Sequence, residues 1–256
     1  MVLRKALSKR LPVLLLPVLI LLPTPLFAFT EDIKPEIAAA LQGADTAQAV
    51  QLLQQEIEID KGYHLNYYVL GLIYANQMKT SRAKEMFKTA LDKKSKHWES
   101  LYQLGLCYIA LDQGDSAQKV MERGRKKAKK GMQHIFENGY GLTMLKKGDY
   151  QEAEKAFLKA LIDHPDNAEY LINLGDAYFY QGVPSLAITY YKKAEELAPG
   201  STEVYYHWAE ACLEMRDYNC ALEKLRLVLS RDSTFANAWM LAGGIYFNAA
   251  LSTRSY

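Results

Sequence analysis

The fold of this chain is decided by a stretch near its middle, residues 140–165, which reads YGLTMLKKGDYQEAEKAFLKALIDHP. Two short helical patterns meet at the tetrapeptide KGDY, and the second pattern ends at His-Pro. Gly141 lies inside the first pattern, where a glycine weakens a helix by about 1 kcal/mol relative to alanine. A residue with that cost needs a structural reason, and a single copy of the pattern does not supply one.

The glycine recurs in a fixed phase along the chain. The recurring small residues are Gly71, Gly105, Gly141, Gly175, Ala209 and Gly243, at intervals of 34, 36, 34, 34 and 34 residues. Twelve residues after each of the first five comes an alanine, at Ala83, Ala117, Ala153, Ala187 and Ala221. Four residues later comes a bulky apolar residue, at Phe87, Met121, Phe157, Tyr191 and Leu225. Three further on lies Ala90, Gly124, Ala160, Ala194 or Val228.

Each unit of this repeat is interpreted as two helices. Glycine in the first helix and alanine in the second mark the place where we expect the two axes to come closest. We call these crossing positions the seam. A lone pair of helices cannot bury both of its apolar faces, so we expect neighbouring units to stack.

These positions resemble the tetratricopeptide repeat. The resemblance is clearest in LINLGDAYFYQGVPSLAITYYKKAEELAPG (171–200) and YYVLGLIYANQMKTSRAKEMFKTAL (67–91). It implies an all-α solenoid, a right-handed superhelix of helix–turn–helix units. Five full units would cover 64–235, after a degenerate unit at 29–63 and before a half unit at 236–256. The apolar residues of the degenerate unit are Ile33, Ile37, Leu41, Ala49, Leu53 and Ile57.

The first 28 residues have the layout of a secretory signal peptide. Basic residues in RKALSKR precede an apolar run over 11–22, and a breaker segment, PTPLFA, ends at Ala28. We therefore expect export to a periplasm or to the outside, with Phe29 as the first mature residue. The alternative is an uncleaved membrane anchor. Prolines at 12, 17, 23 and 25 disfavour it, because a spanning helix needs about 20 apolar residues.

Charge and cysteine content exclude several classes of protein. The formal net charge is +2, and the leader holds four cations and no acid, so the remainder carries +2 − 4 = −2. That balance argues against a nucleic-acid or anionic-membrane binder. The three cysteines are expected to be unpaired thiols in a chain long enough to form a core, with a Cys212–Cys220 disulfide as the alternative. The absence of CxxC and HExxH predicts no metal site.

The sequence shows no catalytic signature and implies no cofactor. None of the five histidines belongs to a nucleophile–base motif, and no glycine-rich phosphate loop is present. We expect a binding protein, and the enzymatic alternative is a subunit whose site forms across several repeats.

A candidate partner groove follows from the resemblance, because in this family the first helix of each unit lines the concave surface. A second stripe on these helices comprises Tyr68, Leu72, Tyr102, Leu106, Asn138, Leu142, Ile172, Asp176, Phe179, Tyr180, Tyr206 and Glu210. Aromatic and aliphatic residues dominate its N-terminal part, and acidic ones its C-terminal part. The stripe predicts a protein or peptide partner with an apolar or basic segment. The alternative for each aromatic residue is packing between adjacent units.

Two departures from the repeat remain. The interval of 36 contains RGRKKAKKG (123–131), which is either a docking patch for an acidic partner or phosphate-bearing surface, or a solvated helix end. The stretch 233–253 has no charged residue, although its asparagines and Gly243-Gly244 disfavour a membrane span. It either docks onto another subunit or partner, or folds uncapped against the preceding unit.

The sequence thus predicts an exported protein–protein interaction scaffold that binds a peptide or helix, in envelope assembly or secretion. The first alternative is a structural adaptor that an uncleaved leader anchors to a membrane. The second is the enzyme subunit.

Overall fold

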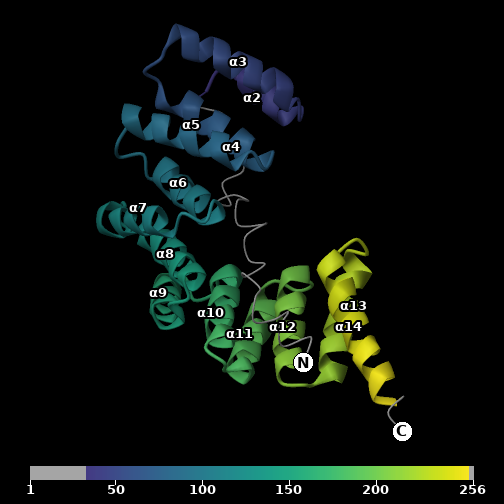
Figure 1. The fold of residues 1–256 in the computed structure, drawn as a ribbon. Coiled ribbons are helices and arrows are strands. Elements are labelled where there is room, and N and C mark those ends of the chain that lie inside the picture. Colours follow the sequence, from purple (N-terminus) through teal and green to yellow (C-terminus); the bar gives the residue numbers. More distant parts are fainter. Residues whose placement is uncertain (1–32, 254–256) are drawn as a thin grey trace. The chain divides into compact units, whose positions relative to one another are not determined.

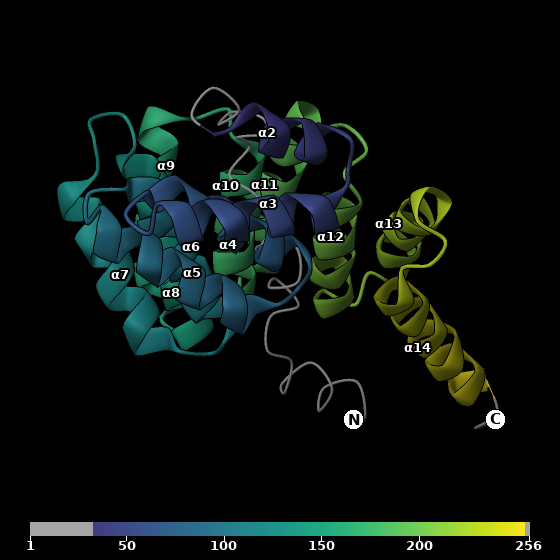
Figure 2. The ribbon, with the colours of Figure 1, turned by 90° about the horizontal axis from the view of Figure 1, so that it is seen from above.

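The computed structural model describes residues 33–253, with side chains for 33–247. The predicted signal peptide, residues 1–28, lies outside the described residues. Within 33–253 the regular secondary structure is entirely helical (Figures 1 and 2), which confirms the predicted all-α repeat fold.

The described chain divides into two compact units, 33–147 and 148–253. The first unit contains α2 (Pro35–Gln42), α3 (Thr46–Ile59), α4 (His64–Asn76), α5 (Thr80–Lys93), α6 (Trp98–Ala110), α7 (Gly114–Lys127) and α8 (Gln133–Lys147). The second contains α9 (Tyr150–Asp163), α10 (Ala168–Tyr180), α11 (Pro184–Leu197), α12 (Thr202–Glu214), α13 (Tyr218–Arg231) and α14 (Ala236–Thr253). The division falls between the two helices of the repeat that contains Gly141.

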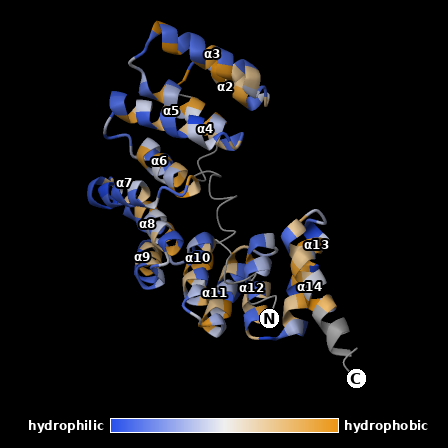
Figure 3. Cartoon of the chain, viewed as in Figure 1, coloured by the Kyte–Doolittle hydropathy of each residue, from blue (hydrophilic) through white to orange (hydrophobic). Residues whose placement is uncertain are grey.

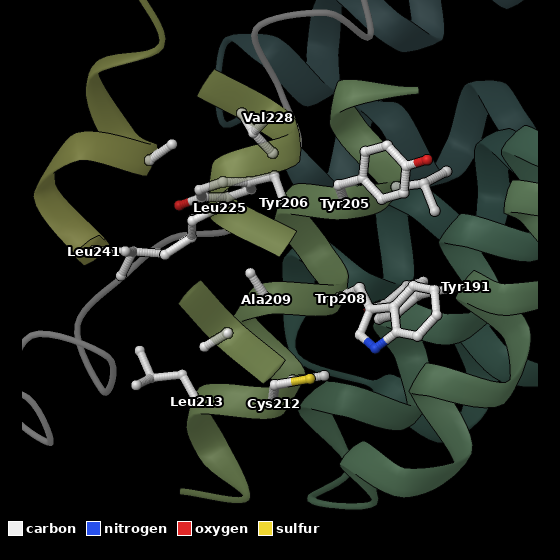
Figure 4. Packing of buried hydrophobic residues seen from close by; sticks show 14 of the residues in the cluster. Tyr191, Tyr205, Tyr206, Trp208, Ala209, Cys212, Leu213, Leu225, Val228 and Leu241 are labelled. Atoms are coloured by element: carbon white, nitrogen blue, oxygen red, sulfur yellow. The ribbon is translucent and has the colours of Figure 1, made fainter. Parts of the chain in front are cut away.

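The recurring small and bulky residues form the core. All five alanines of the seam have no exposed surface, and the five bulky residues that follow them are at most 1% exposed. Burial of large apolar side chains at a regular interval supplies the main stabilising term of such a stack, at about 25 cal/mol per Å². Figure 4 shows side chains from α11, α12, α13 and α14 in one such cluster, among them Tyr191, Trp208, Leu225 and Leu241.

At Gly71, Gly105 and Gly175, the side chain nearest to an added Cβ is the bulky residue, rather than the alanine, of the second helix. A Cβ added at Gly71 would lie 2.6 Å from Cε1 of Phe87. An added Cβ at Gly175 would likewise overlap the ring of Tyr191. The missing side chain of each glycine therefore makes room for a ring or a methionine of the second helix. Ala209 occurs where the facing residue is the shorter Leu225.

Every turn from a first helix to a second helix contains one residue with positive φ. These residues are Ala44, Met78, Asp112, Gly148, Gly182 and Arg216, with φ of 56, 58, 58, 82, 81 and 62°. They follow the same 34- and 36-residue intervals as the seam. Four of the six are not glycine, so the stacked helices hold residues in a conformation that costs an isolated L-residue about 1 kcal/mol or more.

Helix α14 packs against α13 with one face only (Figure 1). The buried residues of this face are Ala238, Leu241, Ala242 and Ile245, whereas Trp239, Met240, Tyr246 and Phe247 are exposed. Gly243, the last of the recurring small residues, was expected to lie at a helix crossing, and this expectation is wrong. An added Cβ at Gly243 has no atom within 4 Å.

The length and hydropathy of the helices give no indication of a bilayer-crossing segment within residues 33–253.

The cysteine expectation is also corrected. Cys212 near the end of α12 and Cys220 in the first turn of α13 form a disulfide, with their Cα atoms 5.9 Å apart. The short turn between two antiparallel helices brings the two positions together, which sequence separation alone does not reveal. Cys107 is a free, buried thiol, and burial raises its pKa to about 12.

Candidate partner-binding site

Six of the predicted groove residues lie in the unit 33–147 and are all buried. They are Tyr68, Leu72, Tyr102, Leu106, Asn138 and Leu142. The Tyr68 ring contacts Phe87 of α5 and His97, with centroids 5.9 and 4.9 Å apart. Tyr102 meets Phe136 of α8 edge-on at 5.8 Å. In this unit the two tyrosines pack between neighbouring helices, as the alternative interpretation expected.

The other six lie in the unit 148–253 and are less uniform. Ile172, Asp176 and Tyr206 are buried, whereas Phe179, Tyr180 and Glu210 are partly exposed. Phe179 and Tyr180, in the last turn of α10, contact each other edge-on with centroids 5.2 Å apart. Tyr180 also stacks on Tyr150 of α9 at 5.5 Å. These partly exposed rings adjoin the acidic part of the predicted groove.

A buried polar cluster joins α10, α11 and α12. Asp176 is only 1% exposed. Its Oδ1 accepts a hydrogen bond of 2.7 Å from the Tyr191 hydroxyl and lies 3.1 Å from Nδ1 of His207. Its other oxygen, Oδ2, is buried and accepts no hydrogen bond within the part of the chain that the structure describes. An unpaired buried acceptor costs free energy, so Oδ2 makes this cluster less stable than full pairing would.

Glu210 extends the cluster toward the surface. Its Oε2 lies 3.9 Å from Nδ1 of His207, and its Oε1 accepts a hydrogen bond of 3.1 Å from the Tyr206 hydroxyl. Glu203, one turn before His207 on α12, is near enough for its charge to raise the pKa of that histidine. Three carboxyl groups therefore surround one imidazole.

The protonation of His207 follows from these neighbours. Burial alone lowers the pKa of an imidazole, but the charge and hydrogen bond of Asp176, with Glu210 and Glu203, raise the pKa of His207 to about 9. Burial and the adjacent Asp176 also raise the pKa of the Tyr191 hydroxyl. His207 is thus an imidazolium at neutral pH, and the carboxyl groups still outnumber it.

Sequence reasoning identified Asp176 and Glu210 and missed His207 and Tyr191 as their partners. The i, i+3 spacing of His207 and Glu210 was a signal for one contact. The contacts to Asp176 cross between helices, and Tyr191 was assigned only to the seam.

The arrangement is suited to binding a cation. An acidic surplus at a partly exposed aromatic surface favours a Lys or Arg side chain through charge, hydrogen bonds and ring contacts. The residues that the structure describes contain no group of three or more His, Cys, Asp or Glu side chains placed to hold a metal ion.

Known proteins that resemble this chain contain the same kind of repeat. Residues 77–134 and 141–202 match models described as tetratricopeptide repeat. The chain is 26% identical over 100 residues to Tetratricopeptide repeat protein 8 of Caenorhabditis elegans. That match covers 38% of this chain and 20% of the relative, so the chain spans about a fifth of the relative's length.

Solved structures show the same fold at low identity. PilW, a type IV pilus biogenesis factor, has a TM-score of 0.71 and 16% identity, over 80% of this chain and 94% of its own. A tetratricopeptide repeat protein from Parabacteroides merdae has the same score and identity, over 95% and 90%. Pseudomonas aeruginosa pilF has a TM-score of 0.65 and 15% identity, over 87% and 98%.

Proposed function

Because the chain belongs to the tetratricopeptide repeat family, we propose that it is an exported protein–protein interaction scaffold. The repeat family and the all-α solenoid support an interaction role in general. The proposal adds three specific points, namely export, the chemistry of the bound segment and a role at the cell envelope.

Export is supported by two independent features. The leader has the layout of a signal peptide, and Cys212 and Cys220 form a disulfide. Disulfides persist in oxidising compartments and are rare where thiol reductants are abundant. A role in envelope assembly or secretion is consistent with the fold that the chain shares with PilW and pilF, although their identities of 16 and 15% carry the fold alone.

Two measurements test export. N-terminal sequencing of the native protein is expected to begin at Phe29, whereas an intact leader would favour the membrane-anchored adaptor. Thiol labelling of the denatured, unreduced protein is expected to modify Cys107 alone. Labelling of all three cysteines would contradict residence in an oxidising compartment.

The bound segment is proposed to be a basic and apolar peptide at the first helices of the unit 148–253. The surplus of carboxyl groups around His207 is the observation that carries this proposal. Glu210 is the partly exposed acceptor of this cluster, and Phe179 and Tyr180 supply partly exposed ring surface. A binding role is proposed over catalysis because none of the five histidines belongs to a nucleophile–base motif.

Photocrosslinking tests this surface. A benzoylphenylalanine placed at Tyr180 in the native envelope is expected to capture peptides containing Lys or Arg beside apolar residues. The same probe at Tyr218, exposed on α13, is the matched control. Glu210→Gln is expected to reduce capture at Tyr180. Equal capture at both positions, or capture of acidic peptides at Tyr180, would refute the proposed specificity.

The residues left exposed on α14 are proposed as a second contact, either with another copy of the chain or with a partner.

A further inference from the structure

A pocket of about 610 Å³ lies in the unit 33–147, at the ends of α6, α7 and α8. Trp98 and Leu101 of α6 and Phe136 of α8 form its apolar lining. The Phe136 ring packs on Gly124 of α7, where an added Cβ would overlap it. None of these residues belongs to the predicted groove.

The pocket adjoins the one irregular interval of the repeat. The connections before α4, α6, α10, α12 and α14 each contain four residues, whereas the one before α8 contains five. Helix α8 also begins eight residues before its seam glycine, compared with seven for α4, α6 and α10. Both inserted residues therefore lie between α7 and Gly141, and two residues of the longer connection, Ala128 and Lys129, line the pocket.

Four cations surround this apolar lining. Lys96 and Arg123 contribute from the loop before α6 and from α7, and Lys127 and Lys129 from the end of α7 and the following loop. Arg123 is held in place by a 2.8 Å hydrogen bond from its guanidinium to the Ser95 carbonyl. Figure 3 shows α7 as a largely hydrophilic helix.

These charges are poorly compensated. Within residues 33–247, Lys96, Lys127 and Lys129 form no ion pair shorter than 4.0 Å. The charge of Lys129 acts on the carboxyl group of Glu99. An oxygen of that carboxyl group lies 3.3 Å from Nε2 of His97. Residues 33–147 hold 18 Lys and Arg against 12 Asp and Glu, a net of +6. The surrounding unit therefore reinforces the positive potential at the pocket.

We propose that this pocket binds an acidic segment of a partner protein that carries a bulky apolar side chain. The apolar side chain would enter between Trp98 and Phe136, and carboxylates on either side of it would meet the lysines. The cations come from three separate stretches of the chain, which suits charges spaced along an extended peptide. This site is separate from the proposed cation-binding surface in 148–253 and takes the opposite charge.

A synthetic peptide, acetyl-Glu-Asp-Phe-Glu-Asp-amide, tests the proposal by calorimetric titration into the full mature chain. We expect binding to weaken about tenfold in Lys127→Glu/Lys129→Glu, which replaces two attractions by two repulsions. The matched control is Lys126→Glu/Lys130→Glu, which changes the net charge equally in the same stretch but outside the pocket lining. The control is expected to bind within about twofold of the wild type.

A further variant and a further peptide distinguish binding in the pocket from nonspecific attraction between opposite charges. Ala128→Trp is expected to block the pocket without removing a charge, and circular dichroism verifies that each variant is folded. A peptide with Gly in place of Phe is expected to bind at least about tenfold more weakly, since a buried Phe contributes the apolar contact.

Three results would overturn the proposal. These are equal losses in the two lysine pairs, equal affinity of the Gly peptide, and stronger binding of anionic phospholipid vesicles than of the Phe peptide. Glu210→Gln leaves this titration unchanged if the two sites are independent, so failure here is distinguishable from failure of the groove proposed for 148–253.

Discussion

At Gly175 the absence of one methyl group determines how closely α10 and α11 approach. An added Cβ would overlap Tyr191, which is 1% exposed and whose hydroxyl is bound to Asp176 at 2.7 Å. The ring cannot move aside without losing that hydrogen bond. The seam and the polar cluster are therefore coupled through a single tyrosine.

We expect Gly175→Ala to destabilise the protein by about 1–3 kcal/mol through overpacking. The larger Gly175→Leu change should cost at least as much. Gly243→Ala is the matched control, because an added Cβ there meets no atom within 4 Å and should strengthen α14 by up to about 1 kcal/mol. Thermal unfolding measures both variants. Wild-type melting of Gly175→Leu would show that the seam is wrongly placed.

His207 gives a pH-dependent contribution to stability. Its pKa is about 9 in the folded chain, above the ordinary value of 6.5. The folded state therefore holds this proton more tightly than the unfolded state does. The contribution is complete below about pH 6.5 and is lost as the pH rises through about 9, with an upper size of about 3 kcal/mol.

Urea unfolding between pH 6.5 and 9 measures this effect. We expect the unfolding midpoint of the wild type to fall with rising pH, and that of His207→Gln to change less. His97 contributes little in this range, because burial lowers its pKa to about 3 and it stays neutral. Parallel slopes in wild type and His207→Gln would contradict the assigned cluster.

At the level of single residues, the sequence predicted burial but not the contacts of the polar cluster. The period predicted which positions of each second helix are buried, because small residues recur at a fixed interval where packed helices leave no room for larger ones. It did not predict the partners of Asp176. Its contacts join α10 to Tyr191 on α11 and His207 on α12, and contacts between helices are not encoded in any local pattern.

At the element scale, the left-handed residue in each first-to-second-helix turn is imposed by stacking. Met78 and Asp112 adopt the conformation without the help of glycine. Neither residue belongs to a turn motif that predicts a left-handed conformation. The sequence therefore predicted the period of the repeat but not the backbone geometry of these turns. The Cys212–Cys220 pairing has the same origin, since it depends on how tightly α12 turns into α13.

We expect Gly182→Ala to cost about 1 kcal/mol. Gly182 has φ +81°, and an added Cβ would meet nothing within 4 Å, so the cost is that of the backbone conformation alone. Gly43→Ala is the control, because Gly43 ends α2 at φ −75° with an ordinary contact of 3.4 Å. Thermal unfolding compares them. An equal effect of the two changes would mean that the turn conformation is not strained for alanine.

At the scale of the whole chain, charge is divided between the two units. Residues 33–147 carry a net of +6, whereas 148–253 hold 8 Lys and Arg against 15 Asp and Glu, a net of −7. The near-neutral total of the sequence conceals this difference, so the prediction of a slightly acidic body described neither unit. This division agrees with the two binding surfaces of opposite preference that we propose, one in each unit.

The last prediction concerns the exposed apolar residues of α14. Trp239, Met240, Tyr246 and Phe247 are all more than half exposed, and Figure 3 shows α14 as a mainly hydrophobic helix. A contiguous apolar surface of this kind is typical of an interaction site. We expect light scattering at tens of micromolar to report a mass above that of the monomer, or a partner to co-purify.

Met240→Lys/Phe247→Lys should weaken that association by at least about tenfold, because each buried side chain contributes about 1.5–3 kcal/mol. Leu158→Lys/Ile162→Lys is the matched control, since both residues are exposed on α9 and the change in charge and apolar surface is comparable. The control should associate as the wild type does. A monomeric wild type with no partner recovered would contradict the prediction. In that case α14 is an uncapped helix, and one buried face is enough to hold it against α13. That face consists of Ala238, Leu241, Ala242 and Ile245.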